Sequence, residues 1–157
     1  MTHEGGCACG KVRYRLKSDP IVVHCCHCRW CQRESGSAFA LNAVIEAGRL
    51  ELLSDAPERI DTPSASGRGQ AIFRCRSCRI AVWSFYGGAG EKAPFIRVGT
   101  LDNPDACPPD VHIFTDSKQP WVVLPEEAEA FGQFYSGGDM PRIYGADGAA
   151  RWMALKG

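Results

Sequence analysis

Nine cysteines stand in this chain of 157 residues, and most of them fall into short clusters. Four of the nine lie between Cys25 and Cys31, which is too crowded for independent disulfides. In a reducing compartment disulfides seldom persist, and clustered cysteines there are typical of metal ligation. Thiolate chemistry around a soft metal ion is therefore the first function that the residue types suggest.

Cys7, Cys9, Cys75 and Cys78 form the first group of candidate ligands. Side chains two residues apart in an extended segment point the same way, so Cys7 and Cys9 can face one ion. Cys75 and Cys78 have the two-residue spacing of a zinc knuckle, and four thiolates complete a tetrahedral structural zinc site. Two alternatives are less favoured. Cys75 and Cys78 could be a redox pair, but the βαβ context of such pairs is absent. All four could be buried free cysteines, but two matched pairs are then a coincidence.

Cys26, Cys28 and Cys31 form the second group and combine the same two spacings. Three protein ligands and an open position are typical of a catalytic zinc, whereas four ligands are typical of a structural one. Cys25 points away from Cys26 in an extended chain, which argues against it as a fourth ligand. The local sequence leaves both possibilities open, because three neighbours could close the site: His24, Cys25 and His27.

Short β-type runs separated by Gly, Pro and Ser predict the elements that position these cysteines. The predicted strands cover residues 11–16, 21–23, 39–45, 50–53, 71–74, 81–86, 95–100 and 111–114. Helices are predicted over 30–34 and 126–134, and the tail after Ser136 is expected to be loosely structured. The pattern indicates a mainly antiparallel β fold with one or two short helices.

Charge and hydropathy argue against a nucleic-acid-binding protein, a membrane protein and a secreted protein. Eighteen basic and eighteen acidic residues give a formal net charge of +0, so no nucleic-acid partner is expected. No apolar run approaches the roughly 18 residues of a transmembrane helix. The polar start of the chain, MTHEGGCACGK, does not have the pattern of a signal peptide, and we expect a cytoplasmic protein without membrane association.

Three motifs occur in order along the chain: GCACG at 6–10, CHCRWCQR at 26–33 and FRCRSC at 73–78. They are followed by GTLD at 99–102 and HIFTDSKQPW at 112–121. This set resembles the glutathione-dependent formaldehyde-activating enzyme family, a family also found in centromere protein V. The resemblance covers about residues 5–124, so we expect a zinc-containing β domain over 1–124 and a C-terminal extension over 125–157.

The resemblance implies an Mss4-like zinc-containing β fold with two zinc ions per chain. By position, Cys7, Cys9, Cys75 and Cys78 match the structural ligands, and the catalytic ligands correspond to Cys26, Cys28 and Cys31. The family's named activity condenses formaldehyde with glutathione to S-(hydroxymethyl)glutathione, formally a carbon–sulfur lyase reaction run backwards. The resemblance favours the open form of the second site.

Arg79 follows the knuckle where the family usually has glycine. Glycine there permits a left-handed backbone. Arg79 is therefore expected either to adopt that conformation at some cost or to change the turn.

The leading hypothesis is a zinc-dependent carbon–sulfur lyase-like enzyme that acts on a small thiol such as glutathione and an aldehyde. His112 and His27 are candidates for proton transfer, although hydrogen-bonded structural histidines are more common. Lys118 could pair with a substrate carboxylate, and Trp121 and Phe114 are expected to fill core.

Two other functions are consistent with the sequence. A zinc-stabilised binding module would have both sites structural, with Cys25 or His24 as the fourth ligand of the second zinc. Thiol redox sensing by Cys25 or Cys107 is the other possibility. Oligomers are compatible with any of these functions.

Overall fold

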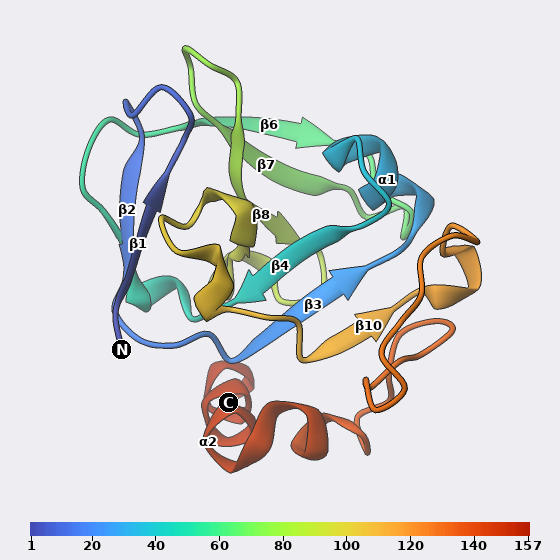
Figure 1. Cartoon of the computed structure of the whole chain (residues 1–157). Helices are drawn as coiled ribbons and strands as arrows, with labels where there is room; N and C mark the ends of the chain where they lie inside the picture. The colour runs from blue at the N-terminus through green and yellow to red at the C-terminus, as the bar shows by residue number, and fades with distance from the viewer. The chain divides into compact units, whose positions relative to one another are not determined.

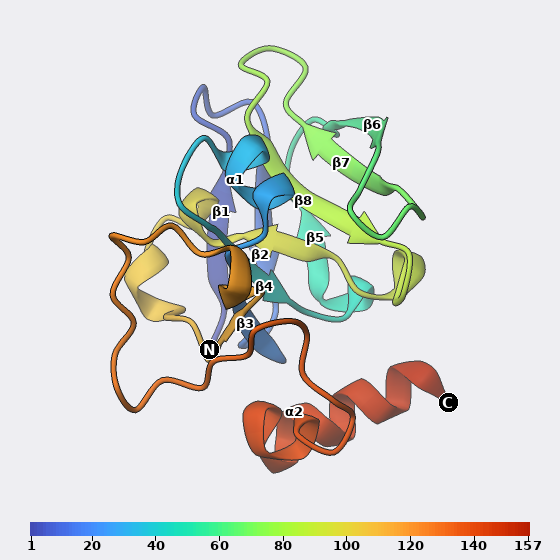
Figure 2. The same cartoon turned by 90° about the vertical axis from the view of Figure 1, so that its right-hand side faces the viewer.

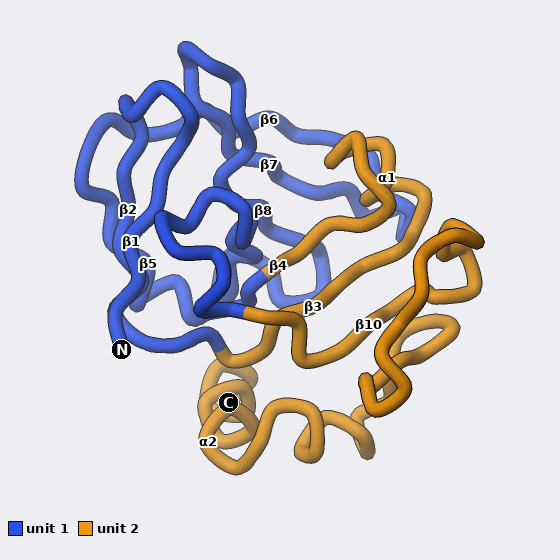
Figure 3. Tube along the Cα trace, viewed as in Figure 1, with its two compact units in different colours: residues 1–20, 43–107 blue, residues 21–42, 108–157 orange.

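The computed structural model describes all residues from Met1 to Gly157, which form two compact units (Figure 3). The first unit contains Met1–Pro20 and Ala43–Cys107, and the second contains Ile21–Asn42 and Pro108–Gly157. Each unit is thus assembled from separate stretches of the chain. The expected boundary between 124 and 125 falls inside the second unit, and that division of the chain stays a prediction.

The first unit holds two groups of antiparallel strands (Figures 1 and 2). Three strands pair in the order β1–β2–β5: β1 (His3–Gly6), β2 (Arg13–Leu16) and β5 (Leu50–Leu52). Four more pair in the order β9–β8–β7–β6: β6 (Glu58–Thr62), β7 (Gln70–Arg74), β8 (Ala81–Tyr86) and β9 (Phe95–Arg97). Short 3₁₀ turns lie at Ala47–Arg49, Gly90–Lys92, Val98–Thr100 and Pro104–Ala106.

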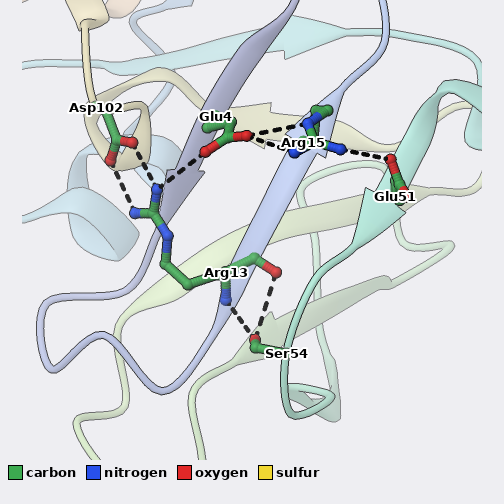
Figure 4. Close-up of polar contacts among 6 residues, drawn as sticks. All are labelled: Glu4, Arg13, Arg15, Glu51, Ser54 and Asp102. Carbon is green, nitrogen blue, oxygen red and sulfur yellow. Dashed lines mark hydrogen bonds and ion pairs between the residues drawn. The ribbon is translucent and has the colours of Figure 1, made fainter.

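Strand β2 shows why alternating residues build this unit. Tyr14 and Leu16 are fully buried, whereas the arginines between and before them lie on the other face. On that face Arg13 donates to Asp102 (2.8 Å) and Arg15 donates to Glu4 (2.7 Å), as Figure 4 shows. These pairs are partly solvated, so each stabilises the fold by about 1 kcal/mol at most. Burial of β2's apolar face is therefore the larger contribution.

The second unit contains β10 (Val111–Ile113) paired with β3 (Val22–Cys26), which in turn neighbours β4 (Ala40–Val44). The β10–β3 pair is parallel, an exception in a mainly antiparallel fold. All five residues of β3 are buried. Helix α1 (Arg29–Ser35) follows it, and β4 then carries the chain into the first unit. A 3₁₀ turn lies at Thr115–Ser117, and α2 (Met140–Lys156) ends the chain (red in Figure 2).

The expected fold class is confirmed: the chain is mainly antiparallel β with two helices. Every predicted strand is present, although β1 and β6 were not predicted because their sequences, HEGG and ERIDT, lack an apolar run. The predicted helix over 30–34 corresponds to α1.

Two expectations about the C-terminal part are wrong. Residues 126–134 form no helix, because the backbone of Glu129 and Phe131 bonds to that of His112 (2.8 and 2.9 Å) instead. The tail is not loosely structured, since α2 occupies most of it with a kink at Gly145. Tertiary contacts hold α2: Tyr144 bonds the Tyr135 hydroxyl at 2.6 Å. Local glycine content therefore misled the prediction.

Gly5 in β1 leaves no room for a side chain, and Gly5→Ala is expected to destabilise the protein by about 1–3 kcal/mol. A Cβ there would lie 2.5 Å from the Thr100 carbonyl oxygen and 2.6 Å from the Tyr14 hydroxyl. The matched control is Gly99→Ala, whose Cβ would meet nothing within 4 Å. Urea denaturation of both variants measures the difference, and equal stabilities would contradict this reading of β1.

Candidate metal centres

Four cysteine sulfurs converge in the first unit. Cys7 and Cys9 follow β1, while Cys75 and Cys78 lie in the turn between β7 and β8. All four Sγ atoms lie within 4.8 Å of one another, and Cys9 Sγ is 3.6 Å from the sulfurs of both Cys7 and Cys75. Tetrahedral zinc with Zn–S bonds of about 2.3 Å places its sulfurs about 3.8 Å apart, so this donor set fits such an ion.

Backbone N–H groups around this cluster point at its sulfurs. Val12 N donates to Cys7 Sγ (3.3 Å), and Ser77 N donates to Cys75 Sγ (3.4 Å). Hydrogen bonds of this kind favour the charged thiolate over the thiol. The pKa of Cys78 falls to about 6, first because of the backbone N–H of Ile80. The environment is thus suited to thiolates, the form in which cysteine binds metal.

Of the two alternatives expected for Arg79, the structure shows the left-handed backbone, with φ of 67°. The turn is closed by two backbone bonds, from Arg79 N to Cys75 O and from Cys75 N to Ile80 O, both 3.0 Å. The strain of such a residue is on the order of 1 kcal/mol. The knuckle therefore keeps its shape without glycine.

Cys26, Cys28 and Cys31 converge in the second unit, where β3 ends and α1 begins. Their Sγ atoms lie within 4.8 Å of one another. Cys28 is the N-cap of α1, and its sulfur accepts the backbone N–H of Cys31 at 3.3 Å. The sequence spacing places Cys31 one turn into the helix, so the cap that starts α1 also assembles the trio.

The electrostatics of the trio favour a cation. The Cys26 and Cys31 thiols donate to Cys28 and lower its pKa to about 2. The contact with Cys28 raises the pKa of Cys26 to about 12, and contacts with Cys26 and Cys28 raise that of Cys31. Crowded thiols oppose one another's ionisation, whereas a divalent cation among them favours the thiolate form of all three. The donor set therefore fits a soft metal ion such as zinc.

The three candidates for a fourth ligand have other partners. Cys25 Sγ lies 3.5 Å from His27 Nε2. His24 Nε2 lies 2.7 Å from the Tyr135 hydroxyl, and His24 is not among the residues grouped with the trio. Cys25 and His27 instead form a third cluster with His112, with ligand atoms within 4.8 Å of one another. No further His, Cys, Asp or Glu ligand atom is grouped with the three sulfurs of the trio.

His27 and His112 form a stacked, hydrogen-bonded pair. His27 Nε2 is 3.0 Å from His112 Nδ1, and the rings are 5.3 Å apart. Burial lowers the pKa of His27 to about 4 and also lowers that of half-buried His112, so both are neutral at pH 7. His27 Nδ1 is buried without a partner. Burying an unpaired ring nitrogen without a proton costs less free energy than burying an unpaired N–H, so the His27 proton lies on Nε2. His27 Nε2 therefore donates to His112 Nδ1, and His112 carries its own proton on Nε2.

A cavity of about 500 Å³ opens along α1. Its lining comes from one face of the helix and from a later segment: Arg29, Gln32, Arg33, Gly36, Ser37, Ala38, Gln119 and Trp121.

Trp121 is 70% exposed, so the expectation that it fills core is wrong. Phe114 is half-buried against the ring of Phe134. Lys118 Nζ donates to the backbone oxygen of Val122 at 2.8 Å.

The sequence patterns assigned no role to Gln32 or Gln119, although both stand inside the motifs at 26–33 and 112–121. Both are neutral residues outside any cysteine spacing, and only the tertiary structure brings their side chains together (3.1 Å).

A family model and a curated relative agree on one family. The family model described as "Glutathione-dependent formaldehyde-activating enzyme" matches residues 2–117. A Halomonas elongata protein named "Putative glutathione-dependent formaldehyde-activating enzyme" is 31% identical over 133 residues, covering 79% of this chain and 82% of that protein. A crystal structure of a Rhodobacter sphaeroides protein aligns with a TM-score of 0.47 and 16% identity, over 82% of this chain and 99% of that one. Neither helix of the chain is long and apolar enough to cross a membrane.

Proposed function

Because this chain belongs to the glutathione-dependent formaldehyde-activating enzyme family, we propose that it joins formaldehyde to the thiol of glutathione or a similar molecule. The reaction is that of a carbon–sulfur lyase run in the direction of synthesis. The observation that carries the proposal is the convergence of three sulfurs, from Cys26, Cys28 and Cys31, without a fourth protein ligand. A closed four-ligand site would have no position for a substrate.

Two zinc ions per chain are part of the proposal. Cys7, Cys9, Cys75 and Cys78 would hold a structural ion, and Cys26, Cys28 and Cys31 would hold the second. Bound zinc supplies a soft Lewis acid that lowers the pKa of a thiol at the open position. The chain's own contribution is to bring the trio together at the start of α1 and to place neutral imidazoles nearby.

The bonds in the proposed reaction balance without an oxidant or reductant. A bond forms between the thiol sulfur and the carbonyl carbon, the C=O double bond becomes a single bond, and the thiol proton ends on the oxygen. His112 holds a proton at Nε2 and can donate it to the developing alkoxide. His27 fixes this tautomer through its 3.0 Å bond to His112 Nδ1, and takes no direct part.

His112→Ala is expected to lower kcat by roughly 10²- to 10⁴-fold, the usual contribution of a positioned proton donor. The zinc content is expected to stay unchanged, because His112 lies outside both zinc-binding groups of the proposal. Steady-state kinetics and native mass spectrometry of the same preparation measure both quantities. Unchanged kcat would remove His112 from the mechanism and leave the proton to solvent.

The direct test of the function uses ¹³C-formaldehyde and glutathione, followed by NMR. The zinc-loaded protein is expected to accelerate the appearance of S-(hydroxymethyl)glutathione beyond the spontaneous reaction. Protein stripped by a chelator and reloaded with zinc is the control for metal dependence. No acceleration by the zinc-loaded protein would favour the alternative, a zinc-stabilised binding module with both sites structural.

A further inference from the structure

The third cluster, formed by Cys25, His27 and His112, is separate from both groups of candidate zinc ligands. Side chains alternate along an extended chain, so Cys25 and His27 share one face of it, opposite to Cys26. Strand β10 runs parallel to β3, and His112 is the direct partner of Cys25 in that pair. The strand register therefore brings these three side chains together, all within the second unit.

The donor atoms of this cluster stand at distances that one metal ion would bridge. His27 Nε2 lies 3.5 Å from Cys25 Sγ and 3.0 Å from His112 Nδ1, and all three atoms lie within 4.8 Å of one another. Bonds of about 2.0 Å to nitrogen and about 2.3 Å to sulfur separate two ligand atoms of one ion by roughly 3.3–3.6 Å. The cluster therefore needs only small side-chain movements to hold an ion.

Hydrogen bonding alone leaves the cluster incompletely satisfied. Both contacts meet at His27 Nε2, whose single proton is donated to His112 Nδ1. The Cys25 thiol consequently has no acceptor at that nitrogen, and its sulfur has no second hydrogen-bond partner. A sulfur and two imidazole nitrogens that converge on one point are a donor set for a cation.

The backbone fixes the cluster before any ion arrives. The His27 carbonyl oxygen accepts from Gln32 Nε2 (2.8 Å) and from Ser117 Oγ (3.0 Å), while the pairing of β10 with β3 holds His112. Cys25 and His27 are buried, whereas His112 is half-buried and gives the cluster its exposed side. Ligands that are already held in place lower the entropic cost of binding.

The number and types of these ligands favour copper over zinc. Zinc sites in proteins are almost always four-coordinate, and no further His, Cys, Asp or Glu ligand atom is grouped with these three. One cysteine and two histidines are, by contrast, the ligand set of trigonal copper sites. Copper(II) also stands above zinc(II) in the general order of divalent-ion affinity. The third cluster is therefore suited to copper, whereas the two groups made of cysteine alone are suited to zinc.

We propose that Cys25, His27 and His112 form a third metal site, which binds one copper ion in addition to the two zinc ions. On binding, the Cys25 thiol loses its proton to solvent, the His27 proton moves from Nε2 to Nδ1, and His112 keeps its proton on Nε2. His112 thus retains the proton that the proposed reaction uses. Buried His27 Nδ1 has no partner for a proton, which weakens the binding of any ion roughly tenfold to a hundredfold and again favours the strongest binder.

The test adds one equivalent of copper(II) chloride to the zinc-loaded protein in the absence of oxygen. Native mass spectrometry is expected to find one copper and two zinc ions per chain, and visible spectroscopy is expected to show a sulfur-to-copper charge-transfer band. Cys25→Ala is expected to abolish the band. Cys25→Ala and His112→Gln are each expected to weaken copper binding, measured by competition with a chelator, roughly a hundredfold or more, because loss of an outer-sphere partner already costs tenfold to a hundredfold.

The matched controls are Cys107→Ala and His3→Gln. They remove a buried thiol and a buried histidine of the first unit that belong to none of the three clusters, and both variants are expected to bind copper like the wild type. The zinc count of each cluster variant checks that its second unit is folded, since the trio lies in the same unit.

The inference is wrong if the wild type binds no copper, if copper binds only by displacing zinc, or if both cluster variants bind copper as tightly as the wild type. A third zinc ion that is lost in Cys25→Ala would overturn the assignment to copper. None of these results depends on whether formaldehyde is condensed, so the site and the proposed function can fail separately.

Discussion

Replacing Cys28 by alanine is expected to remove one zinc ion per chain and to reduce condensation to the spontaneous rate. Only two thiolates, Cys26 and Cys31, would remain at that site, too few for the three-ligand catalytic arrangement. The first cluster keeps its ligands, so the fold is expected to persist with reduced stability: the variant loses the stabilisation from the second ion and an N-cap of α1 that is worth about 1 kcal/mol. Native mass spectrometry counts zinc, and NMR follows the product.

Cys25→Ala is the matched control for this change. Cys25 is adjacent to the trio in sequence, but its sulfur contacts His27, so its removal is expected to leave the zinc count unchanged. Zinc loss in Cys25→Ala would make Cys25 the fourth ligand and the site a closed one, which would contradict the proposed reaction. Retention of both ions in Cys28→Ala would show that the trio is not the ligand set.

Replacing Cys75 by serine is expected to have the largest effect on stability. Apparent binding free energies of structural zinc in small zinc-binding peptides are about 10–16 kcal/mol, as large as the whole stability of a typical domain. Cys75 is buried, and its sulfur lies 3.6 Å from that of Cys9. Serine supplies a poorer ligand for a soft ion. The first unit is therefore expected to lose its zinc and most of its cooperative thermal transition, as measured by calorimetry.

Cys107→Ala is the control for the loss of a buried thiol. Cys107 belongs to the same unit and is only 4% exposed, but it is part of none of the three clusters. Its replacement is expected to cost no more than about 1–2 kcal/mol and to leave zinc in place. Equal melting temperatures and zinc contents for the Cys75 and Cys107 variants would mean that the first cluster binds no structural metal.

The cysteine groups were predictable because their geometry is mostly local. A Cys-x-Cys pair faces one side of an extended segment, and Cys-x-x-Cys turns both sulfurs inward, whatever surrounds them. The two halves of the first group follow different strands, β1 and β7, and come together only when the chain folds. Alternating apolar residues such as those of β2 made a β fold predictable. For Arg79 the sequence left two alternatives, and only the structure showed that it keeps the left-handed backbone.

The C-terminal part was not predictable by the same reasoning. Residues 126–134 have a helix-like composition, but their backbone bonds to His112. Helix α2 has little amphipathic pattern and contains Gly145 and Gly148, yet a hydroxyl contact to Tyr135 and packing against Ile21 hold it. Tertiary contacts outweigh propensities of a few tenths of a kcal/mol per residue.

What the sequence alone determined is the donor chemistry, namely which thiols gather into the two groups and how many each group contains. Only the tertiary structure decided what surrounds the trio. It turned Cys25 and His24 to other partners, paired His27 with His112, and placed Gln119 on Gln32 across 87 residues of chain. The physical reason is the sequence separation of the contacts. The spacing of ligands depends on residues a few positions apart, whereas the direction of a buried side chain depends on groups, often distant in sequence, that pack against it.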